Sequence, residues 1–210
     1  MKKLLFTALL SILIISAISP LSAQESSSLE KPNELYGGYG AFSVYYFTGN
    51  LSHDYYYDNS YSYYYDENDP TSAGTFFLGY NRQVTKVVSV GIVFSYMHTS
   101  NTLNGYYGYY DSLTNMGTTN DHLLSGLSKV NFTYMNKPFL KLYSGAAIGV
   151  TIDLNKATIN GIDYTDRKIM PAGQLTLFGI RAGKALAGFL EFGVGTNGIV
   201  LAGISYRIKD

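Results

Sequence analysis

The stretch Ala187-Gly-Phe-Leu-Glu-Phe-Gly-Val-Gly195 decides the fold class, because its residues alternate between two chemically different faces. One face carries Glu191 among small residues. The other face is apolar and consists of Gly188, Leu190, Phe192 and Val194. The segments on either side, 174–182 and 199–208, alternate in the same way. The sequence therefore predicts three adjacent strands that share one apolar face and one face of small or charged residues.

The turns between these strands test whether the faces belong together. A two-residue Asn-Gly turn would mix the faces of the last hairpin, whereas a three-residue loop at 196–198 keeps them in phase. The loop also puts Gly198 at a left-handed position, as a bulged hairpin requires. The same rule applies to the turn at 183–185. The predicted pairs are Glu191 with Gly203 in the last hairpin and Gly179 with Phe189 in the one before it.

The remainder of the chain repeats this pattern and predicts eight strands in all. Their ranges are 36–47, 75–83, 87–97, 123–134, 140–152, 174–182, 187–195 and 199–208. The inward face of the first strand is left open. Pairing across the turns at 84–86 and 136–138 sets Asn81 opposite Ser89 and Lys129 opposite Gly145. Three longer segments, predicted to be loops, alternate with the short turns: 51–73, 101–121 and 153–170. Short turns at one end and long loops at the other are typical of outer-membrane barrels.

The charge content of the chain indicates which face of the strands points outward. Only 14% of the residues are charged, against about 25% in ordinary soluble domains. The charges of the central strands gather on the small-residue face, as a polar network predicted to line the lumen: Lys129, Lys141, Arg181, Glu191 and Arg207. A soluble, lipocalin-like barrel would need charges on the other face. We therefore predict an all-β, eight-stranded antiparallel up-and-down transmembrane β-barrel with short periplasmic turns and long tyrosine-rich external loops.

The N-terminal region predicts export. Two lysines precede an apolar run that ends in small residues near Ala23, which is the layout of a cleaved signal peptide. The apolar run is shorter than the roughly twenty residues of a membrane-spanning helix. We assign 1–23 to a signal peptide, 24–35 to a polar periplasmic linker and 36–210 to the barrel, and we expect the protein in the cell outer membrane, with outer-membrane lipid around it.

At this point the chain resembles the small eight-stranded outer-membrane β-barrel proteins, similar to the transmembrane domain of outer membrane protein A and to outer membrane protein X. Gly203, Tyr206 and Ile208 match the Gly-x-x-aromatic-x-hydrophobic signal of the last strand in that family. The resemblance implies that barrel-assembly machinery reads these three residues during insertion. Lys209 and Asp210 follow, where such barrels commonly end on an aromatic residue.

Glu191 is the one carboxylate predicted in the lumen, and four cations are expected around it. Such a carboxylate would be ionised and paired. The network could form an ion-selecting constriction, which makes a small or gated channel the alternative function, or a packed polar plug. We favour the plug, because side chains fill the lumen of an eight-stranded barrel.

The external loops are the predicted place of recognition, because tyrosine gives large amphipathic contact area at low entropic cost. The contact candidates are Tyr55, Tyr56, Tyr57, Tyr63, Tyr64, Tyr65, Tyr106, Tyr107, Tyr109 and Tyr110. The expected function is structural or adhesive, with an extracellular protein or glycan as ligand. A formal net charge of zero does not support a nucleic-acid partner, and we expect a monomer without cofactor or metal site.

His98 and Ser100 form a weaker candidate at the external end of the third predicted strand. Small outer-membrane barrels include lipid A-modifying enzymes with a histidine and a serine at such a rim. No acid is fixed beside His98 by the sequence, so we expect no catalytic residues and keep this enzyme as a lesser alternative.

Overall fold

The computed structural model describes residues 33–45, 65–106, 113–159 and 161–208. These ranges contain eight strands: β1 (Asn33–Ala41), β2 (Tyr65–Gln83), β3 (Val88–Tyr106), β4 (Leu113–Lys137), β5 (Leu140–Ile159), β6 (Ile162–Gly183), β7 (Leu186–Gly195) and β8 (Val200–Ile208). Each strand pairs antiparallel with its neighbours in sequence, and β1 pairs with β8 to close the barrel. Within these ranges, no helix is long and apolar enough to cross a membrane. The predicted fold class, an eight-stranded up-and-down barrel, is confirmed.

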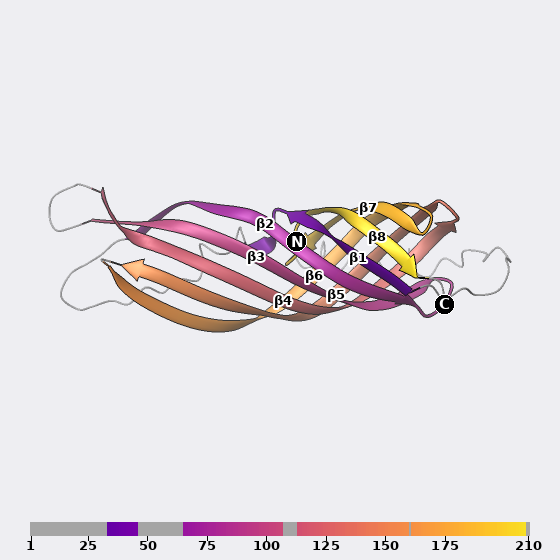
Figure 1. Ribbon diagram of the computed structural model, residues 1–210, viewed down its shortest axis with the longest axis horizontal. Coiled ribbons are helices and arrows are strands. Elements are labelled where there is room, and N and C mark those ends of the chain that lie inside the picture. Colours follow the sequence, from indigo (N-terminus) through magenta and orange to yellow (C-terminus); the bar gives the residue numbers. More distant parts are fainter. Residues whose placement is uncertain (1–32, 46–64, 107–112, 160, 209–210) are drawn as a thin grey trace, which may run out of the picture.

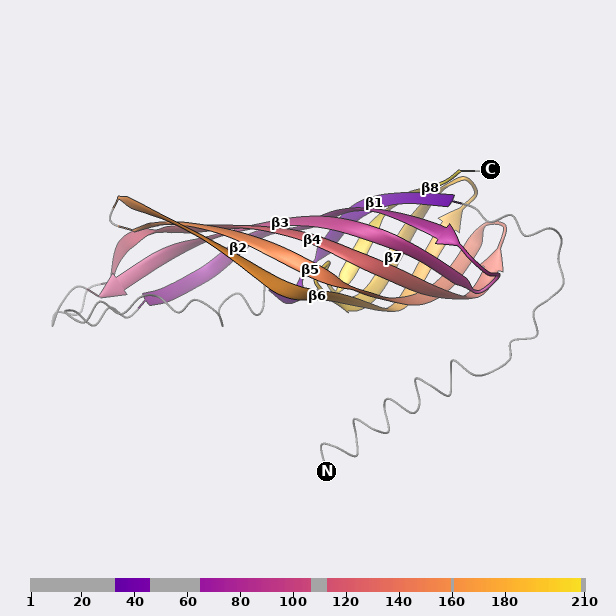
Figure 2. The ribbon, with the colours of Figure 1, turned by 90° about the horizontal axis from the view of Figure 1, so that it is seen from below.

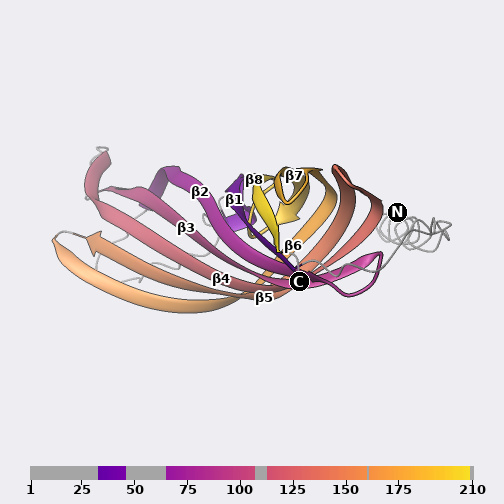
Figure 3. The same cartoon turned by 45° about the vertical axis from the view of Figure 1, so that its right-hand side comes forward.

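The strands fall into two length classes. β2 to β6 have 19 to 25 residues, whereas β1, β7 and β8 have 9 or 10. At about 3.3 Å per residue, β4 is roughly 80 Å long and β1 roughly 30 Å. The five long strands therefore continue past the closed barrel as an open, curved sheet (Figures 1 and 3). We call this part the projecting sheet; it comprises residues 65–74, 98–106, 113–122, 153–159 and 162–173.

The chain ends of the barrel lie together at the opposite end from the projecting sheet. Asn33 at the start of β1 pairs with Ile208 at the end of β8. The connections from β2 to β3, from β4 to β5 and from β6 to β7 lie at this same end, which we call the short-turn end (Figure 2). The predicted asymmetry between the two ends of the molecule is thus present.

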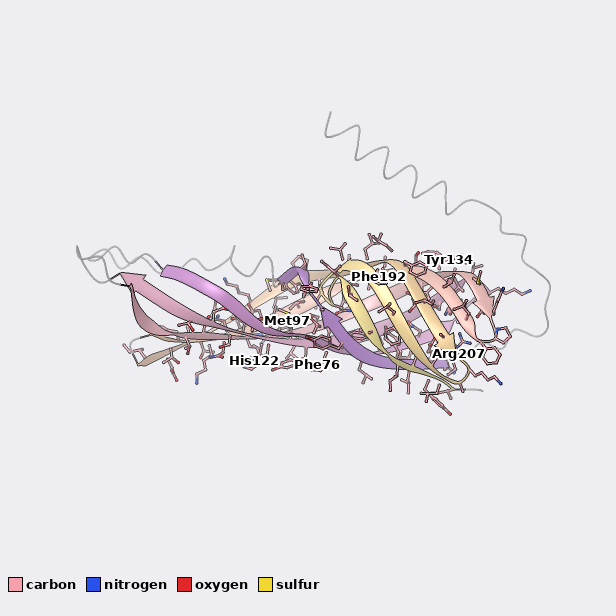
Figure 4. All side chains as sticks on the ribbon, turned by 90° about the horizontal axis from the view of Figure 1, so that it is seen from above. Phe76, Met97, His122, Tyr134, Phe192 and Arg207 are labelled. Atoms are coloured by element: carbon pink, nitrogen blue, oxygen red, sulfur yellow. The ribbon has the colours of Figure 1, made fainter. Side chains whose placement is uncertain are left out.

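The two faces of the barrel strands separate as predicted. Apolar side chains are exposed around the outside of the barrel. Every strand contributes at least one of them, for example Leu35, Leu78, Ile92, Phe132, Ile148, Leu177, Phe192 and Ile204. Polar and charged side chains are buried inside it. The first strand, left open by the sequence, follows the same rule, with Leu35 and Tyr39 outside and Glu34 and Tyr36 inside. Figure 4 shows Phe192 on the outside of the barrel and Tyr134 and Arg207 toward the short-turn end.

The predicted registers are wrong by two residues in all four hairpins, although the faces are right. The observed pairs are Asn81 with Gly91, Lys129 with Ala147, Gly179 with Glu191 and Glu191 with Leu201. Bulges between Thr133 and Met135 and between Thr176 and Phe178 shift two of these ladders. A shift of two leaves every side chain on its face, so alternation fixes the parity of a register and leaves its value open.

The parts of the three predicted long loops that the structure describes are mostly strands, which is the main correction to the sequence analysis. Residues 65–73 belong to β2, 101–106 to β3, 113–121 to β4, 153–159 to β5 and 162–170 to β6. These segments lack a continuous apolar face, and for that reason they resembled loops. A strand that projects into water needs only its backbone ladder and does not need such a face.

The first strand is also displaced from its predicted place. β1 begins at Asn33, inside the predicted linker 24–35, and ends at Ala41 rather than at residue 47. Its backbone is paired on both sides, with Glu34 opposite Asn81 of β2 and opposite Arg207 of β8. A residue assigned to a linker therefore belongs to the barrel wall.

Candidate functional site

A buried ion pair lies inside the barrel between β4 and β7. Nζ of Lys129 donates to Oε1 of Glu191 at 2.9 Å, and both side chains are less than a tenth exposed. The hydroxyl of Tyr143 donates to the same oxygen at 2.8 Å, and Oγ1 of Thr176 donates to Oε2 at 3.0 Å. The Lys129 ammonium also stands 5.2 Å from the ring centre of Tyr36. Charge pairing and hydrogen bonds together offset the large cost of removing two ions from water.

A second ion pair lies nearer the short-turn end. Nε of Arg181 on β6 donates to Oε1 of Glu34 at 2.6 Å and to Oγ of Ser205 at 2.8 Å. The rest of the guanidinium donates to main-chain oxygens of the β6–β7 turn, at Gly183, Lys184 and Ala185. Arg181 thereby ties three strands and one turn together, and it is only 2% exposed.

Lys141 and Arg207 complete the predicted lumen network but take no part in its two ion pairs. Lys141 is buried, with Nζ 3.5 Å from Oε1 of Gln83 and 5.6 Å from the ring centre of Tyr143. Arg207 is half-buried. A small cavity of about 20 Å³ lies among these groups, lined in part by Asn81 and Asn131. Their Oδ1 atoms are buried without a protein partner, and such a space holds about one water molecule.

An apolar cluster blocks the lumen beside the ion pairs. The rings of Tyr36, Phe77 and Phe189 lie 6.0 to 6.3 Å apart, centre to centre. Four further buried side chains join them: Val93, Leu127, Ala172 and Leu201. The sequence analysis expected small and polar side chains inside the barrel and missed this cluster.

The loop between β7 and β8 closes the lumen at the end that faces the projecting sheet. Thr196, Asn197 and Gly198 are buried, and Gln174 holds the loop by accepting from the N–H of Asn197 and donating to the carbonyl of Gly198, both at 2.9 Å. Ser43 donates to the carbonyl of Thr196 at 2.6 Å. Gly198 has φ of +126°, so the predicted positive φ is confirmed.

Four of the five predicted lumen residues are buried, Arg207 is half-buried, and one correction concerns the carboxylates among them. Glu191 is not the only carboxylate in the lumen, because Glu34 of β1 pairs with Arg181. The sequence analysis had placed Glu34 in a linker. Extending the alternation of β1 from Tyr36 toward the N-terminus would have placed Glu34 on the same face as Tyr36, since residues two apart share a face.

The projecting sheet is a second candidate site and has a different chemistry. From Ile162 to Gly173, β6 has a strand partner on one side only within the described part of the chain, because its pairing with β7 begins at Gln174. Ile162 and Tyr164 are more than half exposed. Charged side chains follow the same segment: Asp163, Asp166, Arg167 and Lys168.

The tyrosines predicted to make external contacts are divided by the structure. Tyr65 lies in β2 opposite Gly105, and Tyr106 lies in β3 opposite Leu113. The others lie outside the described residues: Tyr55, Tyr56, Tyr57, Tyr63, Tyr64, Tyr107, Tyr109 and Tyr110. The contact role of these tyrosines stays a prediction.

The predicted assembly signal lies in β8, on two faces. Tyr206 and Ile208 point outward and are 53% and 38% exposed. Gly203 lies at the seam with β1, where a Cβ would overlap the carbonyl oxygen of Gly37 and come within 2.7 Å of Cα of Gly38. Closure of the barrel alone therefore requires glycine at position 203, and the role of these residues in assembly stays a prediction.

His98 and Ser100 both lie on the outer face of β3. The ring of His98 contacts His122 of β4, its direct partner across the strand pair. His122 is a residue that the sequence analysis did not connect with His98. Strand pairing brought them together, and only a register prediction for the projecting sheet could have found this contact.

These features define a closed, eight-stranded barrel with a filled lumen and a sheet that extends from one rim. No protein-family model matches the chain, and no curated protein sequence matches it. Among solved structures, a similar one is the crystal structure of Ail, the attachment invasion locus protein of Yersinia pestis. The likeness has 15% sequence identity and a TM-score of 0.48, and it covers 86% of this chain and 100% of that chain. At this level no property of that protein is transferred, and the function is argued from the chain's own residues.

Proposed function

We propose that the protein is an outer-membrane β-barrel that acts as a surface-interaction protein through its projecting sheet. The observation that carries this proposal is the continuation of five strands beyond the closed barrel, where 162–173 of β6 pair with β5 and with no second strand among the described residues. The proposal assigns no catalytic residue, and the ring contact of His98 is with His122.

The membrane location is supported by the distribution of side chains in the barrel, which is the reverse of that in a water-soluble protein. Two ion pairs are buried inside it, while Leu78, Ile148 and Ile204 are 64% to 75% exposed outside it. In water this arrangement would expose a continuous apolar belt, whereas in a bilayer the same belt faces lipid. Tyrosines lie near its two borders, as interfacial residues do: Tyr80, Tyr134 and Tyr206 near the short-turn end, and Tyr39 and Tyr96 toward the projecting sheet.

The free edge supports a polypeptide ligand in particular. The backbone N–H and C=O groups along the edge of a sheet can pair with an extended peptide by β-strand addition. The charges of β6, among them Asp163 and Arg167, discourage pairing between copies of the same protein. A ligand strand with complementary charges would be attracted by the charges of β6, and the same charges would make its binding specific.

Trimming the projecting sheet at paired residues tests the proposal. One variant joins Thr99 to Asp121 and Asp153 to Lys168 through Asn-Gly turns, since these residues are direct partners. A matched control replaces 51–64 with a Gly-Ser turn and keeps the sheet. We expect both variants to insert and to migrate differently on gels before and after boiling, and only the trimmed variant to lose capture of extracellular proteins.

Four outcomes would each contradict a part of the proposal. Unchanged capture by the trimmed variant would place recognition elsewhere, and loss confined to the 51–64 variant would assign it to the predicted tyrosine loop. Binding on a glycan array without protein capture would exclude strand addition. Recovery of the mature chain from the soluble periplasm would overturn the membrane location itself.

The channel alternative makes a separate prediction. The apolar cluster, the two ion pairs and the inward loop at 196–198 all lie in the lumen, which argues against a continuous water path. We expect purified protein in planar bilayers to show no large steady conductance. Reproducible channels that pass sugars would contradict the filled lumen.

A further inference from the structure

Two histidines face each other across the β3–β4 strand pair on the outer surface. His98 is the direct partner of His122, and their ring centres are 4.8 Å apart with the ring planes 37° apart. Both are half-buried, just beyond the apolar belt that ends with Tyr96 and Leu124 (Figure 4 labels His122). The chain contains only three histidines, so two of them meet here.

The spacing suits a shared metal ion. A tetrahedral zinc ion binds imidazole nitrogens at about 2.0–2.1 Å, which puts two such nitrogens roughly 3.3 Å apart. Side chains directly opposite on paired strands have Cβ atoms about 4.5–5.5 Å apart, and rings with centres 4.8 Å apart reach this geometry by a small rotation. The β-ladder holds both residues in place without a ligand.

Tyr96 positions one of the two rings. Its hydroxyl lies 2.9 Å from Nδ1 of His122, and its ring stacks on the imidazole at 6.1 Å between centres. When Nδ1 of His122 donates to this hydroxyl, the lone pair of Nε2 is left for a metal. Histidine ligands in metal sites are commonly oriented by a hydrogen bond from their other ring nitrogen.

The surroundings decide what kind of ion fits. In the described residues, no group of three or more His, Cys, Asp and Glu side chains could hold a metal, so the pair would supply two nitrogen ligands and leave further positions open. Imidazole favours zinc and copper over magnesium and calcium. A cation, Arg167, lies two strands away from His122 on the outer face. Leu154 of β5 lies opposite His122 on one side and opposite Arg167 of β6 on the other. Arg167 thus lies about 10 Å from His122 at the usual strand spacing, where its repulsion is largely screened.

We propose that His98 and His122 form a two-histidine site for a divalent transition-metal ion, zinc or copper, at the outer border of the apolar belt. The open coordination positions would take water or an oxygen ligand from a neighbouring molecule. The site is independent of the proposed function, because it needs neither the free edge of β6 nor a protein ligand.

Calorimetric titration of the tag-free barrel in detergent tests the proposal with Zn²⁺ and Cu²⁺ as probes. We expect one ion bound per chain, and no binding of Mg²⁺ or Ca²⁺ under the same conditions. His98→Ala and His122→Ala should each abolish the site. His53→Ala is the matched control, since it removes the third histidine, and it should bind as the parent does. A shift in gel migration on boiling, the same as that of the parent, confirms that each variant folds.

Tyr96→Phe separates a positioned site from two adjacent side chains. It keeps the stacked ring and removes the hydroxyl, so affinity should fall roughly ten- to hundredfold while stoichiometry stays at one. Zinc binding should also shift the ring proton resonances of both histidines. No binding by the parent, or equal loss in His53→Ala, would overturn the two-histidine site. Unchanged affinity in Tyr96→Phe would overturn the role of Tyr96.

Discussion

Five long strands run through both the closed barrel and the projecting sheet, yet the two regions are stabilised in opposite ways. In the barrel, Lys129 and Glu191 are buried and form an ion pair with two further hydrogen bonds to the carboxylate. In the projecting sheet, Lys156 and Asp163 form an ion pair whose two side chains are more than half exposed. The same pairing chemistry thus operates in a confined site and in open water.

This difference indicates where the molecule tolerates change. A buried charge that loses its partner stays buried, whereas an exposed charge that loses its partner is hydrated. The barrel should therefore be sensitive to single substitutions, and the projecting sheet should accept them. A rigid scaffold with a variable extension is the usual basis of a recognition surface.

The strongest way to break the barrel is to obstruct its seam. Gly203→Val puts a branched side chain where β8 approaches Gly37 and Gly38 of β1, and backbone atoms cannot move aside as a flexible side chain can. We expect no folded, heat-modifiable barrel in this variant. Ala202→Val, at the neighbouring outward position, is the control and should fold. Normal folding of Gly203→Val would contradict the close approach at the seam.

Removing Glu191 should give the next largest effect. Glu191→Ala leaves Lys129 buried without a carboxylate, and we expect a loss of about 3–5 kcal/mol in the free energy of unfolding. Urea unfolding in detergent, followed by gel migration, measures this loss. The double variant Lys129→Met with Glu191→Leu removes both charges and should recover most of it. No change in Glu191→Ala would mean that water reaches the site.

These two predictions depend on different kinds of information. The burial of Glu191 among cations followed from the alternation of the strands together with the low charge content of the chain, which indicated that the small-residue face points inward. The partner of Gly203 did not follow, since the predicted register of its hairpin is two residues away from the observed pairing with Phe189. Bulges and turn lengths set register values, and neither leaves a clear sign in side-chain alternation.

The parts that the sequence missed share one cause. Glu34 and the projecting sheet lie where a strand has left the apolar belt or has not yet entered it, so the two-residue alternation of apolar side chains is weak. The contact of His98 with His122 joins residues 24 positions apart through such a region. Only the pairing of whole strands brings these groups together, and local pattern carries no information about it.

The loop at 196–198 lies at the rim where the closed barrel and the projecting sheet meet. Gln174→Ala removes the acceptor for the N–H of Asn197 and the donor to the carbonyl of Gly198. We expect a loss of about 1–3 kcal/mol in unfolding free energy, because these buried backbone groups lose their partners. Gln174→Glu keeps the acceptor but buries an unpaired carboxylate beside the carbonyl of Gly198, so it should cost more. A smaller loss for Gln174→Glu than for Gln174→Ala would mean that water reaches the loop.

The exposed ion pair of the projecting sheet should give the smallest effect. The Asp163 carboxylate accepts a hydrogen bond from the hydroxyl of Thr158 and pairs with Lys156, and these two contacts hold its pKa below the ordinary aspartate value. A depressed pKa stabilises the folded state above the pKa of the unfolded chain, and this contribution disappears as the pH falls through the folded-state value. Solvent and salt screen the pair, so Lys156→Ala should leave the unfolding midpoint unchanged at neutral pH. Asp163→Asn should remove the part of the sheet's acid dependence that this carboxyl contributes below the ordinary aspartate pKa, without altering insertion. Urea titrations at neutral and acidic pH measure both variants, and a loss in Lys156→Ala as large as that in Glu191→Ala would end the distinction between a confined barrel and an open sheet.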